Sequence, residues 1–199
     1  MHIEYFFDCS SPWTYLSYTR IEPICLVTDT QLVWRPFLVG GVFNAVNQSV
    51  YETRANPIPV KARYYQKDMQ DWARFQGITI GNPPIFPVNS VKAMRGCFVA
   101  MELGRISQYA GLVFEAYWSD LKDISNDKVL NEVVEASDMN PEDFFRKIVS
   151  DEYKQKLRRN TDELIERGGF GSPTIYINGD DMYFGNDRLV LVEQRLRGN

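Results

Sequence analysis

Hydrophobic residues alternate with the period of a β-strand at both ends of the chain and with the period of a helix in the middle. At the N-terminal end, residues 3–7 are aromatic and β-prone and predict a strand. Ser11 followed by Pro12 predicts the start of a helix that extends to about residue 26, because proline lacks the N–H that would be unpaired there. Residues 32–37 predict a second strand, so this end forms a β-α-β unit with a right-handed crossover.

The middle of the chain has the spacing of amphipathic helices. Residues 40–59 are expected to form a loop that opens at Gly40-Gly41, and the proline-rich residues 78–88 are expected to be irregular. The remaining apolar stripes predict six helices, at residues 60–76, 91–104, 107–122, 127–137, 141–150 and 151–167. No repeat or low-complexity tract interrupts them, so this segment is expected to be folded and not a linker.

After Gly168-Gly169 the hydrophobic period returns to two. Residues 174–177 predict a strand, Asn178-Gly179 predicts a hairpin turn, and residues 181–184 predict the returning strand. A final helix is expected to begin at residues 185–188.

The order β-α-β, helices, β-β-α predicts an α/β protein with a thioredoxin-like architecture and a large all-helical insertion. Residues 1–38 and 168–199 are expected to form a discontinuous thioredoxin-like domain, and residues 39–167 the inserted helical domain. A length of 199 residues fits one such unit.

Composition narrows the classes of function. The net charge is −4, with no basic stripe, so nucleic acid is not an expected partner. The chain is 44% hydrophobic and 14% aromatic, which supplies a real core and excludes a disordered chain. His2 is the single histidine, so no metal site rich in histidine and no Ser-His-Asp triad is expected.

Signals for export are missing from the sequence. The first residues have no basic region and no apolar run of the kind found in signal peptides, and no stretch approaches the roughly 18 apolar residues of a membrane span. The protein is therefore expected in the cytoplasm, with no membrane partner. Cys9, Cys25 and Cys97 lie far apart and form neither a Cys-x-x-Cys pair nor a zinc spacing, which indicates reduced thiols.

The first candidate site is the junction between the strand at residues 3–7 and the following helix. In a thioredoxin-like layout this junction carries the reactive sulfur, because a helix N-terminus offers free N–H groups and a positive dipole end that stabilise a thiolate. Here Ser11 and Thr14 occupy the two positions of the usual cysteines. A hydroxyl cannot exchange disulfides, but it can donate a hydrogen bond to the thiolate of another molecule. The alternative is that Ser11 only caps the helix.

Two other candidates lie near the C-terminal end. Pro173 entering a strand marks either a sheet edge or a cis peptide bond, and a cis bond would expose the backbone of Ser172 to an extended peptide ligand. Asn186 and Asp187, at a helix start, could bind an amino-acid head group, the aspartate taking the ammonium and the N–H groups the carboxylate. The alternatives are an ordinary strand entry and an ordinary helix cap. The predicted topology brings all three candidates to one edge of the sheet.

Several motifs of the sequence resemble those of a known family. These motifs are similar, in the same order, to those of 2-hydroxychromene-2-carboxylate isomerases, which are relatives of kappa-class glutathione transferases in the DsbA-like branch of the thioredoxin fold. The resemblance spans essentially the whole chain, and its motifs lie at Phe7–Leu16 (FDCSSPWTYL), Arg35–Asn44, Pro59–Asp68, Phe86–Ser90, Gly169–Thr174 and Phe184–Leu189.

The resemblance implies that glutathione is a cofactor and assigns roles to the candidate residues. Ser11 resembles the serine that holds the glutathione thiolate. Ser172, before a cis-Pro173, resembles the residue whose backbone pairs with the cysteinyl unit. Asn186 and Asp187 resemble the pair that binds the γ-glutamyl end.

Further residues are implied for the rest of the site. Lys61 resembles a lysine near the glycyl carboxylate, and the asparagine of the preceding loop matches either Asn47 or Asn56. The polar and basic groups that these isomerases direct towards the substrate carboxylate correspond to Asn89, Lys92 and Arg95.

The function implied by the resemblance is glutathione-dependent cis-trans isomerisation of 2-hydroxychromene-2-carboxylate, or of a related aromatic-degradation intermediate, by reversible thiolate addition. The partner is then a small aromatic carboxylate, and a homodimer is compatible with the resemblance. The first alternative is a kappa-class-like transferase that conjugates glutathione to electrophiles. The second alternative is a non-catalytic protein that binds a thiol or a peptide. The last alternative is a thiol-disulfide oxidoreductase, which is disfavoured because serine and threonine replace both exchanging cysteines.

Overall fold

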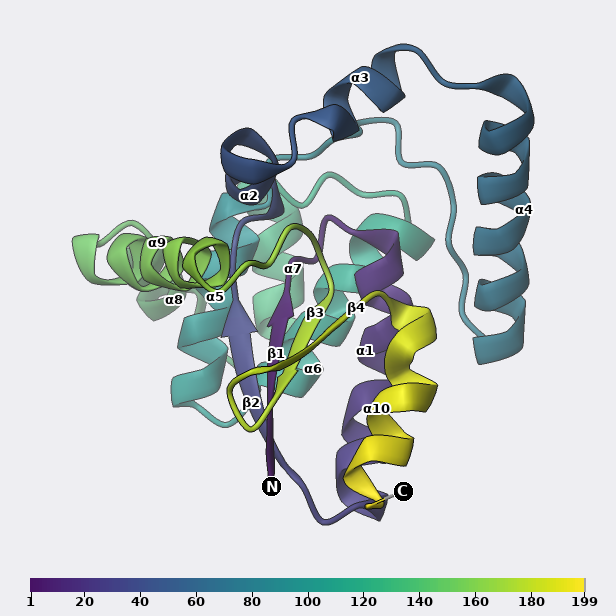
Figure 1. The fold of residues 1–199 in the computed structure, drawn as a ribbon. Coiled ribbons are helices and arrows are strands. Elements are labelled where there is room, and N and C mark those ends of the chain that lie inside the picture. Colours follow the sequence, from purple (N-terminus) through teal and green to yellow (C-terminus); the bar gives the residue numbers. More distant parts are fainter. Residues whose placement is uncertain (199) are drawn as a thin grey trace.

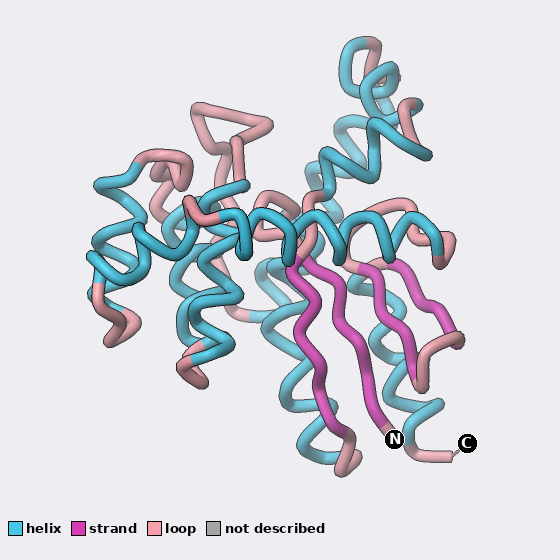
Figure 2. Tube along the Cα trace, turned by 90° about the vertical axis from the view of Figure 1, so that its left-hand side faces the viewer, coloured by secondary structure: helices cyan, strands magenta, loops and turns pink. Residues whose placement is uncertain are grey.

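A four-stranded mixed sheet lies at the centre of the computed structural model, which describes residues 1–198 (Figure 1). The strands lie side by side in Figure 2. Their order is β2-β1-β3-β4, with β1 parallel to β2 and antiparallel to β3, and β3 antiparallel to β4. The strands are β1 (His2–Phe7), β2 (Gln31–Pro36), β3 (Thr174–Ile177) and β4 (Asp181–Phe184). This is the sheet that the sequence predicts.

Ten α-helices accompany the sheet in the described part of the chain. They are α1 (Pro12–Val27), α2 (Val39–Val46), α3 (Ser49–Ala55), α4 (Pro59–Gln76), α5 (Val91–Glu102), α6 (Ile106–Phe114), α7 (Asp127–Ala136), α8 (Pro141–Ile148), α9 (Asp151–Glu166) and α10 (Leu189–Leu196). Helices α2 to α9 all lie between β2 and β3 in the chain, so the thioredoxin-like fold with a helical insertion is confirmed. The exact domain boundaries stay a prediction.

The prediction of a loop at residues 40–59 is wrong, because this segment contains α2 and α3. The glycine pair that suggested a loop lies in the first turn of α2. A Cβ atom on Gly41 would come within 3.0 Å of the Thr161 side chain on α9, so the glycine permits close packing of two helices. The helix expected at residues 107–122 is also shorter, since α6 ends at Phe114 and gives way to a π-helical turn at Glu115–Ser119.

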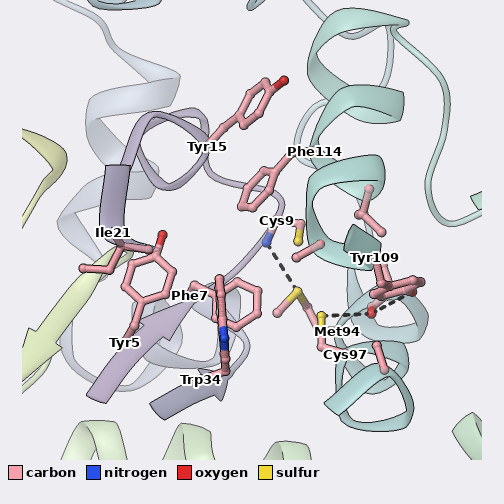
Figure 3. Packing of buried hydrophobic residues seen from close by; sticks show 14 of the residues in the cluster. Tyr5, Phe7, Cys9, Tyr15, Ile21, Trp34, Met94, Cys97, Tyr109 and Phe114 are labelled. Atoms are coloured by element: carbon pink, nitrogen blue, oxygen red, sulfur yellow. Dashed lines mark hydrogen bonds between the residues drawn. The ribbon is translucent and has the colours of Figure 1, made fainter. Parts of the chain in front are cut away.

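The sheet separates two hydrophobic clusters. Ile3, Tyr5 and Phe7 of β1 belong to the larger cluster, which also contains side chains of α1, α5, α6 and α10 (Figure 3). The smaller cluster, on the other face of the sheet, combines residues of β1, β3, α2 and α9 with one residue that follows β2: Phe6, Phe37, Val42, Leu164 and Tyr176. Inserted helices therefore contribute to both clusters and fix the carboxyl ends of β1 and β2.

Helix α4 is packed less closely than the other long helices. Its C-terminal part contacts α1, where Ala73 is buried and Gln76 accepts a hydrogen bond from Thr19 (2.6 Å). The N-terminal part exposes Val60 and Tyr64, and Figure 1 shows this helix at the right-hand edge of the molecule. None of the helices in residues 1–198 is both long and apolar enough to cross a lipid bilayer.

Candidate active site

Ser11 occupies the turn between β1 and α1 and has two hydrogen bonds. As the N-cap of α1, its Oγ accepts a hydrogen bond from the Thr14 backbone N–H (3.3 Å). The same hydroxyl donates to the backbone carbonyl of Ser172 (3.2 Å). Ser11 therefore caps the helix and also faces the second candidate segment, so the two interpretations from the sequence are compatible.

Ser172 and Pro173 form a cis peptide bond, as one reading of the sequence predicts. The Ser172 side chain is buried: its Oγ accepts a hydrogen bond from the Asp8 backbone N–H (3.0 Å) and shares another with Thr14 Oγ1 (2.7 Å). These contacts lock the serine against the start of α1. They also leave its backbone beside Ser11, where an extended ligand could pair with it.

Asp8 is a buried carboxylate at the end of β1, and it links the starts of three helices. Its oxygens accept hydrogen bonds from Ser10 N–H (2.9 Å) before α1, from Val39 N–H (2.9 Å) at the start of α2, and from Ser90 Oγ (3.2 Å) before α5. Burial raises the pKa of Asp8, while the hydrogen bonds from Ser10, Val39 and Ser90 act in the opposite direction. The sequence interpretation did not single out Asp8; an acidic residue directly after a buried strand is the signal that could have found it.

The third candidate segment lies next to the second. The Gly185 N–H donates to the Pro173 carbonyl (3.1 Å), and Asn186 follows in a 3₁₀ turn before α10. The backbone of Gly185 has φ +104°, a conformation that suits glycine. Asn186 is 2% exposed and its Nδ2 has no hydrogen-bond partner in the described chain, while Asp187 is half-exposed and pairs with Arg188. A buried amide without a partner is costly, which points to a ligand as its partner.

The residues implied for the glycyl end of glutathione are more exposed. Lys61 lines a surface cavity of about 250 Å³ on α4 together with Val60, Tyr64 and Tyr65. Of the two loop asparagines, Asn47 ends α2 and donates from Nδ2 to the Phe170 carbonyl (3.0 Å), two residues before Ser172. Asn56 ends α3 and is exposed. Asn47 is thus the one that the structure ties to the candidate site.

Asn89, Lys92 and Arg95 make contacts within the protein. Asn89 Oδ1 accepts a hydrogen bond from the Val91 N–H at the start of α5 (3.1 Å). Lys92 pairs with Asp127 at the start of α7 (Nζ–Oδ1 2.6 Å), and Arg95 donates to the Ile148 carbonyl at the end of α8 (3.3 Å). The two basic side chains therefore lie against α7 and α8, and their role towards a substrate stays a prediction.

All three cysteines are free and buried. The Cys9 N–H donates to Met94 Sδ (3.3 Å), as Figure 3 shows, and the Cys9 carbonyl accepts from the Trp118 indole N–H (2.9 Å). Burial raises the pKa of the Cys9 thiol well above its usual range and that of Cys25 to about 11. Both thiols are therefore protonated and shielded at neutral pH.

A helix N-terminus with a hydroxyl, opposite a residue that precedes a cis-proline, defines a protein of the thioredoxin-fold class. The family model for the DSBA-like thioredoxin domain matches residues 2–197, and the chain belongs to this family. The resemblance inferred from the sequence motifs is confirmed.

Curated relatives match along nearly the whole length. The 2-hydroxychromene-2-carboxylate isomerase of Pseudomonas sp. (strain C18) is 28% identical, covering 98% of this chain and 90% of the relative. Glutathione s-transferase kappa 2 of Caenorhabditis elegans is also 28% identical, covering 96% and 89%. A solved structure of a 2-hydroxychromene-2-carboxylate isomerase superposes with a TM-score of 0.84 at 25% identity, covering 98% of this chain and 94% of that one.

Proposed function

We propose that this protein is a glutathione-dependent isomerase that acts on 2-hydroxychromene-2-carboxylate or a closely related aromatic acid. The observation that carries the proposal is the Ser11 hydroxyl, which caps α1 and donates to the carbonyl before cis-Pro173 (3.2 Å). This is where a thiolate would gain both a hydrogen-bond donor and the positive end of a helix dipole. The full-length similarity to proteins named as isomerases supports the same reaction class.

The residues around Ser11 fit glutathione. The Ser172 backbone offers β-type pairing to a cysteinyl unit, and the unpaired Asn186 amide is a buried donor that lacks an acceptor. Asp187, on the same turn, is the carboxylate for an ammonium, and it would exchange Arg188 for that ligand. Lys61, exposed on α4, is the proposed partner of the glycyl carboxylate.

When bound, glutathione would supply a thiolate for the ring-opened substrate, in which the hemiketal C–O bond has broken to give a ketone and a phenol. The thiolate would add to the double bond conjugated with that ketone, the resulting single bond would rotate, and loss of the thiolate would restore the double bond in the trans form. The Ser11 hydroxyl now bonded to Ser172 would turn towards the sulfur and stabilise its negative charge. Asp8 keeps the starts of α1, α2 and α5 together, so that the donors stay aligned. Three buried free cysteines agree with a reducing compartment such as the cytoplasm.

A second candidate function is conjugation of glutathione to electrophiles. The match to a kappa-class transferase at the same 28% identity favours it, and the thiol site would be unchanged. The two functions differ in the fate of glutathione, which an isomerase regenerates and a transferase consumes. Disulfide exchange is disfavoured, because Ser11 and Thr14 carry hydroxyls and Cys9 is buried.

The test is a spectroscopic assay with hydroxychromene carboxylate, with glutathione either present in catalytic amount or left out. We expect the ultraviolet spectrum to change to that of the trans product only when glutathione is present, with no loss of titratable thiol. Stoichiometric consumption of thiol with an electrophile such as 1-chloro-2,4-dinitrobenzene would favour the transferase. Binding of glutathione with neither reaction would leave only a thiol-binding protein.

A further inference from the structure

Arg54, near the C-terminal end of α3, lies between two aromatic rings. Its guanidinium carbon is 5.5 Å from the ring centroid of Phe43 on α2 and 5.1 Å from that of Phe86 in the segment before α5. A guanidinium that stacks on aromatic rings keeps a defined plane, and its N–H groups remain available at the edge of that plane.

No carboxylate of the described chain neutralises Arg54. Within residues 1–198, no acidic side chain forms an ion pair with Arg54, and its guanidinium donates no hydrogen bond to another residue. By contrast, Arg35 and Arg167 both pair with Glu4 and Glu163. A planar cation with five donors, oriented but unpaired, is suited to a planar anion such as a carboxylate.

One series of contacts connects Arg54 to the turn that carries Ser11. The Phe86 ring lies 6.0 Å from the Trp118 ring, and the Trp118 indole N–H donates to the Cys9 carbonyl (2.9 Å), two residues before Ser11. Two aromatic side chains thus connect the guanidinium with the backbone of Cys9, in the turn that leads to Ser11.

A second series returns from Arg54 to the cis-proline segment. Phe43 lies on α2, and Asn47 at the end of that helix donates to the Phe170 carbonyl (3.0 Å), two residues before Ser172. The rings of Phe170 and Phe184 are 4.4 Å apart and partly exposed beside this segment. The two series of contacts therefore connect Arg54 with the segments that carry Ser11 and Ser172. Figure 1 shows α2 and α3 beyond the carboxyl ends of β1 and β2.

Tyr117 is a further polar group in this region. Its hydroxyl donates to the Ile85 carbonyl (2.8 Å), next to Phe86. Burial raises the pKa of Tyr117 to about 12, and the positive charge of Arg54 acts in the opposite direction. The Tyr117 hydroxyl therefore lies beside the Phe86 segment.

We propose that Arg54 binds the carboxylate of the aromatic acid on which the protein acts, with Phe43 and Phe86 orienting the guanidinium and offering flat surfaces to the acid. The identity of the acid rests on the proposed function, but the carboxylate site does not. Lys92 and Arg95 are already bonded to Asp127 and to the end of α8. Glutathione also carries a glycyl carboxylate, so the experiment must separate the two sources.

The experiment is calorimetric titration of the whole protein with coumarin-3-carboxylate, a planar aromatic acid, and with its neutral carboxamide. The variants are Arg54→Gln, Arg54→Lys and the control Arg105→Gln. Arg105 is also exposed and without an ion pair in the described chain. It follows the C-terminal end of α5, and this helix is about 18 Å long, so Arg105 lies far from the Phe86 segment that precedes α5. Each protein is titrated separately with glutathione, and its melting temperature is recorded.

We expect Arg54→Gln to lower the affinity for coumarin-3-carboxylate by about ten- to hundredfold. The affinities for the carboxamide and for glutathione should not change. Arg54→Lys should recover part of the affinity, since lysine keeps the charge but not the planar fork. Arg105→Gln should bind like the wild type. Equal affinity of Arg54→Gln and wild type, or no binding of the acid by the wild type, would overturn the proposal.

Two further outcomes separate this inference from the proposed function. Loss of glutathione affinity in Arg54→Gln, with the aromatic acid unaffected, would assign the arginine to the glycyl carboxylate and overturn its assignment to the acid. Arg54-dependent binding of the acid in a protein that does not isomerise hydroxychromene carboxylate would support the carboxylate site and reject the proposed function.

Discussion

The two sides of the candidate site are built in different ways. On the side of the sheet, Ser11, Ser172 and Asp8 are joined by hydrogen bonds, and the last two are buried. On the side of α3, Arg54 is exposed and Phe86 is 48% exposed, and the two side chains are in cation–π contact.

This difference separates a fixed half of the site from an adaptable half. Part-buried hydrogen bonds hold Ser11 at the start of α1 before any ligand arrives, so that only its hydroxyl has to turn from the Ser172 carbonyl towards a thiolate. Contacts of an exposed cation with aromatic rings contribute about 0.5–1 kcal/mol each, so they permit adjustment to the shape of an aromatic acid. Substitutions on the sheet side should therefore affect reaction and stability, and those near α3 should affect the choice of substrate.

The largest expected effect is that of Ser11→Ala on turnover. Loss of the donor to the thiolate should lower turnover about hundredfold, by analogy with the removal of one donor from an oxyanion site, while glutathione affinity changes little. The pKa of the bound thiol should rise, which moves the pH–rate profile to higher pH. Steady-state kinetics across pH, together with glutathione titration, measure both.

The control for this variant is Ser10→Ala, since the neighbouring Ser10 hydroxyl makes no hydrogen bond within residues 1–198. Loss of the cap alone should cost Ser11→Ala about 1 kcal/mol of unfolding free energy. A variant that melts earlier but turns over normally would show that Ser11 is only a helix cap.

Asp187→Ala should lower the affinity for glutathione by about ten- to hundredfold, because a charge-assisted hydrogen bond to the γ-glutamyl ammonium is lost. The melting temperature should not change, since Asp187 is half-exposed and its carboxylate pairs with the exposed Arg188. Calorimetry measures the affinity, with Asp180→Ala in the exposed β3–β4 turn as the control. Unchanged affinity in Asp187→Ala would remove this residue from the site.

Asp8→Asn should destabilise the protein by an amount that depends on pH. Below pH 3.8, the ordinary pKa of an aspartate, the Asp8 carboxyl is protonated in both the folded and the unfolded state. The wild type therefore keeps its full advantage in unfolding free energy over Asp8→Asn. Because burial raises the folded pKa, the unfolded chain ionises first as pH rises, and the wild type loses stability relative to Asp8→Asn until the folded carboxyl has also ionised. Urea denaturation of both proteins at about pH 4 and about pH 7.5 measures the difference in unfolding free energy between wild type and variant. A difference that grows with pH would contradict the raised pKa of Asp8.

The smallest effect on turnover is expected when Cys9, Cys25 and Cys97 are all replaced by alanine. The reacting sulfur belongs to glutathione, and the thiols of Cys9 and Cys25 are protonated at neutral pH. Turnover should stay within about twofold, whereas stability should fall by about 1 kcal/mol per site as packing is lost. A folded Cys9→Ala protein without turnover would restore the redox interpretation.

Elements with a strong local pattern could be predicted from the sequence. The expected helix at residues 60–76 is Pro59–Gln76, and the expected strand at residues 181–184 is Asp181–Phe184. Helix α2 could not be predicted, because Gly40-Gly41 carries a loop signal locally. Only contact with Thr161, far along the chain, explains the glycine at position 41.

The same distinction applies to the candidate site. The sequence predicts Ser11 and Ser172 as candidate site residues because each precedes a proline at an end of an element, which is a local signal. The sequence does not point to Asp8 or Arg54, because their contacts come from distant segments, such as Ser90 for the carboxylate and Phe86 for the guanidinium. A sequence pattern finds residues that act through local geometry more readily than residues that act through distant contacts.

The indole of Trp118 gives the protein a built-in optical probe. It is 3% exposed, bonded to the carbonyl of Cys9 at the edge of the fixed half and in ring contact with Phe86 in the adaptable half. Indole fluorescence depends on the polarity and hydrogen bonding around the ring, so a ligand that moves either contact changes the emission without any label. Replacing Trp13, Trp34 and Trp72 with phenylalanine would isolate this signal, and the arrival of thiol and of aromatic acid could then be timed separately in a single stopped-flow experiment.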